Sequence, residues 1–359
     1  MYLELVDIIA IITTVLLLAF ALFLVILKRR NSADILLALF IFSNALYILG
    51  FLYWRLHQYM PGQIEYVLFI AESCGYIFGP LLYFYTKTLV FKDFSLNKKH
   101  LVHFIPFIVA LLYYYSKINT YIIPVYLLMQ IQIFAYIICC LLLIKQHHKE
   151  LKKYYSSLEK LHLYRLEITL FTFTLMWLVD LAGFFLLIFI PDGTGYYNFT
   201  LIISLSINFI FAILIFYNGM QHPQVLLRQN GNFEKYEKSK LTNQKKEEYL
   251  SKLRLYIEQE KPFLKPSVTL NDFARHLNIP VRDLSQVINE YLHKNFYDLI
   301  NSYRIEEAKN LLKTSSNSTI LEILFEVGFN SKSAFNTAFK KHTGFTPTRY
   351  RNKLIADPL

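Results

Sequence analysis

The chain has 359 residues, of which 55% are hydrophobic, and it carries a formal net charge of +11 at neutral pH. An apolar share of this size argues against an ordinary soluble protein of two domains. The charge is uneven: residues 1–217 contain 15 Lys and Arg against 11 Asp and Glu, whereas residues 218–359 contain 22 against 15. This basic excess favours a polyanionic partner, either nucleic acid or an anionic lipid surface.

Seven apolar runs precede residue 218, and most reach the length of about 20 residues that a helix needs to cross a bilayer. They cover residues 5–27, 33–53, 66–90, 101–115, 121–144, 166–190 and 200–217. The fourth run is short, and Gly79-Pro80 interrupts the third. The sequence therefore predicts an all-α fold that begins with a seven-helix transmembrane bundle over residues 1–217.

The loops after the first, third and fifth runs hold twelve Lys and Arg residues, whereas the alternate loops hold only Arg55 and Lys117. The positive-inside rule then places the N-terminus outside and, after seven crossings, the C-terminus in the cytoplasm. The third basic loop, residues 145–165, is expected to be helical. The first run does not resemble a signal peptide, because acidic residues precede it and its basic cluster follows it.

Polar side chains inside the apolar runs are costly in a membrane and so suggest function. Four of them are candidates for lining a ligand pocket: Glu72, Trp177, Asp180 and Asn208. Trp177 and Asp180 share a helical face, because three positions separate them. The alternative is that these side chains form hydrogen bonds between helices that only hold the bundle together.

Residues 218–265 are expected to connect the membrane part to a soluble part. Asn218-Gly219, His222-Pro223 and Asn230-Gly231 are typical of breaks in regular structure. From Gln244 to Glu260 the pattern predicts an amphipathic helix, whose apolar face is Tyr249, Leu250, Leu253, Tyr256 and Ile257. This helix either packs on its own domain or pairs with a second copy as the signalling helix of a homodimer.

Residues 266–359 predict two helix-turn-helix units bridged by a long helix, Phe296–Thr314. In the first unit Thr269 caps a helix that ends at Leu277, and the turn is Asn278-Ile279-Pro280. The second helix, Val281–Leu292, is expected to bury Leu284, Val287, Ile288 and Tyr291.

The second unit begins with Thr319 and a helix through Val327. Gly328 can take a positive φ and end that helix, after which Asn330 and Ser331 can cap the next one. Gly344 ends the second helix, and Thr346-Pro347 starts a last short helix. A short helix, a turn and a polar, lysine-bearing helix suit insertion into a DNA groove.

Three stretches carry a resemblance to a known family: LNDFARHLNIPVRDLSQVINEYL, YRIEEAKNLL and FEVGFNSKSAFNTAFKKHTGFTPTRYR. Residues Ser267–Lys353, which contain them, resemble the DNA-binding domain of AraC/XylS-type transcription regulators. The apolar part is similar to that of bacterial seven-span AraC-type regulators, through FGPLLYFYTKTL followed by HFIPF. The resemblance implies a sequence-specific regulator of the bacterial inner membrane, with its DNA-binding domain in the cytoplasm. Its implied partners are double-stranded DNA, the lipid bilayer and a small-molecule or lipid signal, without a cofactor.

The resemblance also implies that the second helix of each unit reads bases. By position, the candidates are Arg282, Ser285, Gln286 and Asn289 in the first unit and Lys332, Ser333, Asn336 and Thr337 in the second. Arg and Lys suit guanine acceptors, and Gln and Asn can pair with adenine. Phosphate contacts are expected from Lys340, Lys341, Arg349 and Arg351. The chain departs from the family pattern where Leu321 and Leu324 replace small residues and where Thr337 replaces a common Arg.

We expect neither catalytic residues nor a metal site. The sequence contains no HExxH, GxSxG or Walker motif, and Cys74, Cys139 and Cys140 lie in apolar runs without ligand spacing. The protein is therefore expected not to be an enzyme. The alternative from a different class is a seven-span transporter or membrane enzyme with a regulatory cytoplasmic module. A further alternative is that proteolysis within residues 218–245 releases the DNA-binding part.

Overall fold

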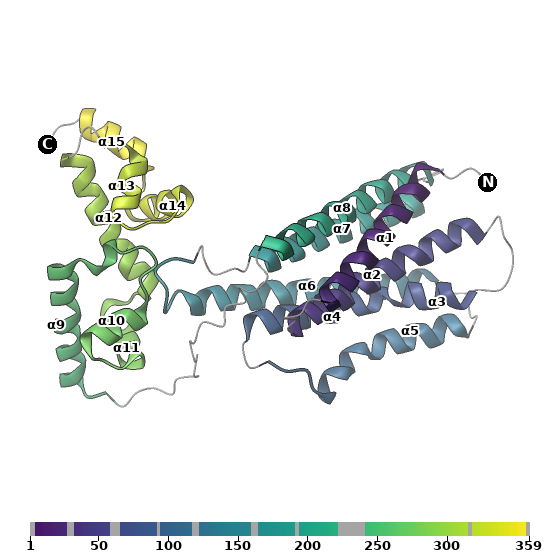
Figure 1. Ribbon diagram of the computed structural model, residues 1–359, viewed down its shortest axis with the longest axis horizontal. Coiled ribbons are helices and arrows are strands. Elements are labelled where there is room, and N and C mark those ends of the chain that lie inside the picture. The colour runs from purple at the N-terminus through teal and green to yellow at the C-terminus, as the bar shows by residue number, and fades with distance from the viewer. Residues whose placement is uncertain are drawn as a thin grey trace. The chain divides into compact units, whose positions relative to one another are not determined.

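The computed structural model describes residues 4–26, 32–57, 65–91, 94–116, 122–158, 164–190, 194–221, 241–314 and 318–356. The chain divides into two compact units (Figure 1). The first comprises residues 1–145 and 162–228, and the second comprises residues 146–161 and 229–359. A short segment between two apolar helices therefore belongs to the unit that holds the C-terminal helices.

The first unit is a bundle of apolar helices. Its elements, of which α6 continues into the second unit, are α1 (Leu5–Ile26), α2 (Ser32–His57), α3 (Glu65–Ser73), α4 (Gly75–Val90), the 3-10 helix η1 (Lys98–Phe104), α5 (Ile105–Tyr115), α6 (Ile122–Leu151), α7 (Tyr164–Phe189) and α8 (Thr194–Gln221). Large apolar side chains are exposed on its surface, among them Phe171 at 68%, Leu112 at 62% and Val15 at 60%. A surface of this kind suits a hydrocarbon solvent rather than water.

Six helical stretches among the described residues are long and apolar enough to cross a membrane. They are Leu5–Ile26, Ser32–Arg55, Leu68–Val90, Pro124–Leu151, Leu166–Phe189 and Gly195–Leu214. The fourth expected run corresponds to α5, which has only 11 residues and directly follows η1. A helix of that length is about 16 Å long, against a hydrocarbon core of about 30 Å. The structure therefore supports six spanning candidates rather than the seven expected.

Two local expectations in the first unit were wrong, and a third, for the loop that follows the fifth apolar run, was wrong in part. The third run breaks at Cys74, between α3 and α4, and Pro80 lies inside α4 without ending it. The helix α8 continues through Asn218-Gly219 to Gln221. The loop of residues 145–165 is helical as expected as far as Leu151, where α6 ends, but residues 152–158 form turns and one isolated β-bridge. The expected breaks at His222-Pro223 and Asn230-Gly231 lie outside the described residues.

The second unit contains, besides residues 146–161, the helices α9 (Asn243–Glu260), η3 (Pro262–Leu264), α10 (Leu270–Leu277), α11 (Val281–Leu292), α12 (Phe296–Thr314), α13 (Ile320–Glu326), α14 (Lys332–Thr343) and α15 (Pro347–Ala356). Local signals explain their boundaries. Thr269 and Thr319 each form a capping box with the acidic residue three positions later, and Ser331 accepts a hydrogen bond from the Ala334 amide. Gly328 adopts the expected positive φ, at 89°, and Gly344, which ends α14 as expected, also has a positive φ, at 78°.

Two apolar clusters form the core of the second unit. The first joins α9, α10, α11 and the start of α12, and it includes the buried side chains of Leu253 and Ile257 from α9. The second joins the end of α12 to α13 and α14. The apolar face of the amphipathic helix thus packs within its own unit, as the first of the two interpretations of α9 required. Tyr291 is 37% exposed, contrary to the expected burial.

Candidate nucleic-acid interface and ligand pocket

The helix α11 presents a polar face opposite its buried side chains Leu284, Val287 and Ile288. The four predicted base-reading residues of this helix are spaced at i, i+3, i+4 and i+7 and so share that face. Asn289 is exposed, whereas Arg282, Ser285 and Gln286 are half-buried. The buried face fixes the helix to the core of the unit, and the polar face remains available to a ligand.

Two atoms on this face have unused hydrogen-bonding capacity. The Nε of Arg282 and the Oε1 of Gln286 are buried and have no hydrogen-bond partner among the described residues. The other end of the Gln286 amide donates to Glu290 over 2.9 Å, and Glu290 in turn accepts from Lys246 of α9 over 2.7 Å. Buried polar atoms are normally paired. An arginine and a glutamine with unpaired atoms, four positions apart, are the donor and acceptor types that read base edges.

The helix α14 is arranged in the same way. Phe335, Ala338 and Phe339 are buried. The predicted base-reading residues lie elsewhere on the helix: Lys332, Ser333 and Thr337 are exposed, and Asn336 is half-buried. The structure therefore gives both α11 and α14 a polar face that includes every predicted base-reading residue.

The four predicted phosphate-binding residues have different environments. Lys340 is exposed, and Arg349 is exposed with its guanidinium 5.4 Å from the centre of the Phe345 ring. Lys341 donates to Asp298 of α12 over 2.6 Å. Although partial burial opposes the effect, this hydrogen bond keeps the pKa of Asp298 below its usual range. Arg351 donates to the Ser318 carbonyl over 2.7 Å, so it stabilises the start of α13 and is the least available of the four.

Arg304 is a structurally important residue that the sequence analysis did not single out. Its side chain is 1% exposed. It donates to the carbonyls of Phe263 and Lys265 over 2.7 and 2.9 Å, and its guanidinium lies 5.5 Å from the centre of the Phe329 ring. It therefore holds residues 263–265 against α12 and lies beside Phe329 of the second apolar cluster. Its burial could have been predicted from its position on the apolar stripe of α12, four residues after Ile300 and four before Ala308.

Leu321 and Leu324, the two departures from small residues, have different environments. Leu324 is fully buried in the second apolar cluster, whereas Leu321 is 53% exposed. Only Leu324 therefore changes the packing beneath α14. Thr337, the third departure, is exposed.

A cavity of about 330 Å³ lies in the first unit, among α2, α3, α4, α6, α7 and α8. Its lining includes two carboxylates, Glu72 and Asp180, and seven aromatic residues: Tyr47, Phe51, Trp54, Phe78, Tyr126, Phe184 and Tyr197. Neither carboxylate forms an ion pair with another described residue. Trp54 lies in the last turn of α2 and Tyr197 in the first turn of α8. The cavity is thus at the end of the bundle where α2 ends and α8 begins.

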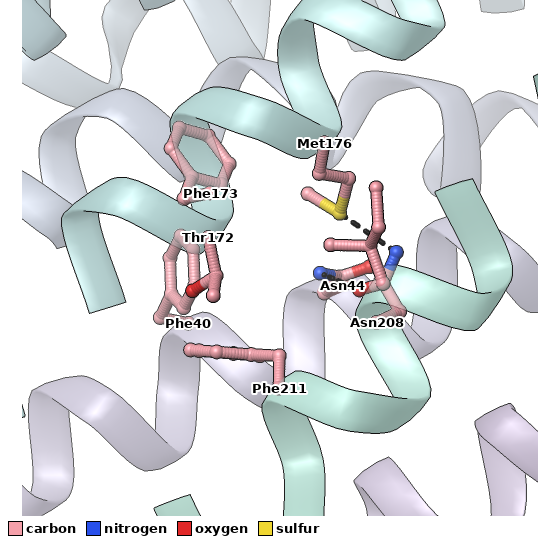
Figure 2. Close-up of a pocket in the computed structure, with 8 residues that line it drawn as sticks. Phe40, Asn44, Thr172, Phe173, Met176, Asn208 and Phe211 are labelled. Carbon is pink, nitrogen blue, oxygen red and sulfur yellow. Dashed lines mark hydrogen bonds between the residues drawn. The ribbon is translucent and has the colours of Figure 1, made fainter. Parts of the chain in front are cut away.

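The four predicted pocket residues are only partly brought together. Glu72, Asp180 and Asn208 all line the cavity, although they come from α3, α7 and α8. Asn208 also accepts a hydrogen bond from Asn44 over 2.9 Å and donates to the Met176 sulfur, as Figure 2 shows. It therefore joins helices as well as lining the cavity. Trp177 is not a lining residue, because its indole points to α6 and donates to Gln130.

Comparison with known proteins supports a DNA-binding role for the C-terminal part. Residues 273–353 match the family described as "Helix-turn-helix domain". The chain is 30% identical over 86 residues to the raffinose operon transcriptional regulatory protein RafR of Pediococcus pentosaceus, which is 24% of this chain and 31% of that protein. It is 29% identical over 85 residues to the melibiose operon regulatory protein of Escherichia coli K12, which is 24% of this chain and 28% of that protein.

Among solved structures, the C-terminal domain of AraT, a response regulator from Geobacillus stearothermophilus, is 34% identical. The match covers 32% of this chain and 88% of that domain, with a TM-score of 0.27. The chain spans less than a third of the length of the two operon regulators. The C-terminal part carries an AraC-type helix-turn-helix domain, and these relatives are transcriptional regulators, in keeping with a protein that is not an enzyme.

Proposed function

We propose that the protein is a membrane-embedded, one-component transcription regulator that binds a specific DNA sequence through two helix-turn-helix units, α10–α11 and α13–α14. The observation that carries the proposal is the pair of polar helix faces on α11 and α14 within an AraC-type domain, in a chain whose described residues include six long apolar helical stretches. In this proposal residues 1–217 form the sensor, residues 218–265 the connector and residues 266–359 the DNA-binding domain.

The sensor part lies in the bacterial inner membrane with the DNA-binding domain in the cytoplasm. We infer a seventh crossing by residues 101–115, shorter than the other six, because it keeps the two large basic loops, residues 92–99 and 145–165, on the same side, as the positive-inside rule requires. Exposed apolar side chains along α5, such as Ile108 at 52% and Val109 at 58%, support a position in lipid. With this orientation the cavity opens on the outer side, away from the end of α8 that leads to the DNA-binding domain.

The signal binds in the cavity of the first unit. A volume of about 330 Å³ is within the size range of small-molecule sites. Aromatic walls, with two carboxylates that form no ion pair among the described residues, suit a small molecule with an apolar body and a positively charged group.

This signal site can be tested by measuring the thermal stability of the full chain in nanodiscs. The stability is compared in the presence of 2-phenylethylamine and of its uncharged counterpart, 2-phenylethanol. Stabilisation by the amine alone, absent in Asp180→Asn, supports the signal site, and equal effects of the two compounds contradict it.

The DNA-binding proposal is tested by selecting sequences from random double-stranded DNA with the full chain in nanodiscs. We expect one discrete sequence, with an affinity that falls steeply as salt rises, because phosphate contacts release counterions. Binding that is salt-sensitive but indifferent to sequence would contradict a specific regulator. Fractionation of cells with alkaline carbonate tests the membrane position separately, because a peripheral protein is extracted and an embedded one is not.

Two variants separate base reading from phosphate binding. Arg282→Ala and Lys332→Ala should each relax the selected sequence at particular positions, because a good pairing between a side chain and a base edge provides about 1–3 kcal/mol of discrimination. Lys252→Ala, on the exposed side of α9, is the matched control and should leave the sequence preference unchanged. Uniform weakening on all sequences would assign the two residues to phosphate binding instead. Native mass spectrometry of the same samples determines whether the regulator is a homodimer.

A further inference from the structure

A segment of the chain far from the DNA-binding domain in sequence is part of that domain in the structure. Residues 152–157, here called the docking segment, follow α6 directly and belong to the second unit together with the C-terminal helices. Leu151, the last residue of α6, is 3% exposed, and Ser156 is 2% exposed. The segment is therefore anchored to its own unit at Ser156, and its other residues are half-buried.

The docking segment caps the first turns of two helices. The amide of Leu270, the first residue of α10, donates to the Tyr154 carbonyl over 2.8 Å. The amide of Tyr297, the second residue of α12, donates to the Lys152 carbonyl over 3.0 Å. The first four amides of a helix have no partner within the helix, and they need one from elsewhere. The segment supplies that partner to α10 and to α12, the helices that flank α11.

The segment also pairs with the residues before α10 through one isolated β-bridge. The Ser156 amide donates to the Val268 carbonyl over 3.2 Å, and the Ser156 hydroxyl donates to the same carbonyl over 2.6 Å. The Ser156 amide bond, together with the bond from the Leu270 amide to the Tyr154 carbonyl, forms an antiparallel bridge between Tyr155 and Thr269. The Tyr154 side chain packs against the first apolar cluster.

The second helix-turn-helix unit is reached through Asn330, which immediately precedes the N-cap of α14. Its side-chain amide donates to the Ser157 hydroxyl over 3.2 Å and to the Ser267 hydroxyl over 3.0 Å. The docking segment thus contacts the start of α10, the start of α12 and the approach to α14. These hydrogen bonds between the segment and the domain involve none of the eight predicted base-reading residues.

We propose that the DNA-binding domain has a docking surface for residues 152–157 of the same chain, and that DNA is bound with the segment docked. The proposal rests on the proposed function for its DNA readout. It gives the membrane helix α6 a direct connection to the domain, in addition to the connector. The two crossings by α7 and α8 place the segment and the domain on the same side of the membrane, whether or not α5 crosses.

Docking is tested with a pair of cysteines at the bridge. In an antiparallel pair of this type, where the flanking residues make the hydrogen bonds, the two Cα atoms are about 4.5 Å apart, within the range that a disulfide accepts. In a chain whose Cys74, Cys139 and Cys140 are replaced by Ala, Tyr155→Cys with Thr269→Cys should cross-link under mild oxidation in native membranes. Tyr155→Cys with Ser251→Cys, on the exposed surface of α9, is the control. Failure of the first pair to cross-link, or equal cross-linking of both, overturns the docking surface.

The same cross-linked protein tests the DNA-bound state. We expect the oxidised and reduced forms to bind the selected DNA with affinities within about twofold, because the bond only fixes the docked segment. The reduced form is the control, since it carries the same substitution at the Thr269 cap. Loss of DNA binding on oxidation, restored by reduction, overturns the proposal that the docked form binds DNA. If neither form binds any specific DNA while cross-linking succeeds, the proposed function fails and the docking surface stands.

A final variant measures the contribution of docking. Ser156→Pro removes both the amide and the hydroxyl that donate to Val268, whereas Lys153→Ala removes only a side chain that pairs with Glu150. We expect Ser156→Pro to weaken DNA binding by about tenfold or more, because it removes two hydrogen bonds that favour the competent form. Lys153→Ala should have no effect. Affinities within twofold for the two variants, with the domain folded by circular dichroism, overturn the link between docking and DNA binding.

Discussion

Two glycines of the DNA-binding domain provide a matched test of how the second helix-turn-helix unit is held. Gly328 and Gly344 both have a positive φ, at 89° and 78°. A Cβ atom on Gly344 would meet nothing within 4 Å, whereas one on Gly328 would lie 2.5 Å from the Leu264 carbonyl oxygen. The neighbouring carbonyls of Phe263 and Lys265 accept hydrogen bonds from Arg304, so this stretch of backbone cannot move away easily.

The expected costs follow from these environments. A left-handed conformation costs Ala about 1–2 kcal/mol, and the lower entropy of the unfolded chain returns about 0.4–1 kcal/mol. Gly344→Ala should therefore reduce the free energy of unfolding by about 1 kcal/mol. Gly328→Ala carries the same cost plus a steric overlap with fixed backbone, for which about 1–3 kcal/mol is typical. With a urea dependence of about 1–3 kcal/mol per molar, its unfolding midpoint should be lower by about 1 M than that of Gly344→Ala.

Both midpoints can be measured by pulse proteolysis of the full chain in detergent over a series of urea concentrations. The protease digests the C-terminal domain only where urea has unfolded it, so the loss of this fragment gives the midpoint. Gly328→Asn separates the two contributions at this site. Asn tolerates a positive φ better than Ala does, so it would recover most of the stability if the conformation alone were responsible. Because its Cβ meets the same carbonyl, we expect no recovery. Equal midpoints for Gly328→Ala and Gly344→Ala would refute the contact with Leu264.

Three further predictions concern the same domain. Arg304→Ala should cost about 3–5 kcal/mol in the same unfolding assay, because it leaves two buried carbonyls unpaired, whereas Arg275→Ala on the exposed side of α10 should change stability by less than about 0.5 kcal/mol. The pKa of Asp298 is lower in the folded state, so its ion pair with Lys341 stabilises the fold above the unfolded-state pKa, and the advantage over Asp298→Asn should disappear as the pH falls below about 4. Thr337→Arg should tighten DNA binding at low salt if this position faces a phosphate. The slope of the logarithm of the binding constant against the logarithm of the salt concentration should then become steeper by about 1.

The local boundaries of the DNA-binding domain could be predicted from the sequence because their signals span only three or four residues. The caps at Thr269 and Ser331 and the turn at Gly328 depend on a side chain and the backbone beside it, and the structure has them where they were expected. The same local reasoning failed inside the apolar bundle. Asn218-Gly219 and Pro80 are tolerated within helices there, because the surrounding helices and not the local propensity determine where a helix ends.

The apolar runs, the basic excess and the polar faces of α11 and α14 were determined by the sequence alone, since each is a periodic pattern or a composition. The cavity that joins Glu72, Asp180 and Asn208 was decided by tertiary structure, and so was the exclusion of Trp177, because helix packing selects which side chains on a face meet. The tertiary structure also decided the contact of Ser156 with Val268, which lies 112 positions away in the sequence. A main-chain pairing over that distance leaves no periodic signal in the sequence, and only the fold brings its two segments together.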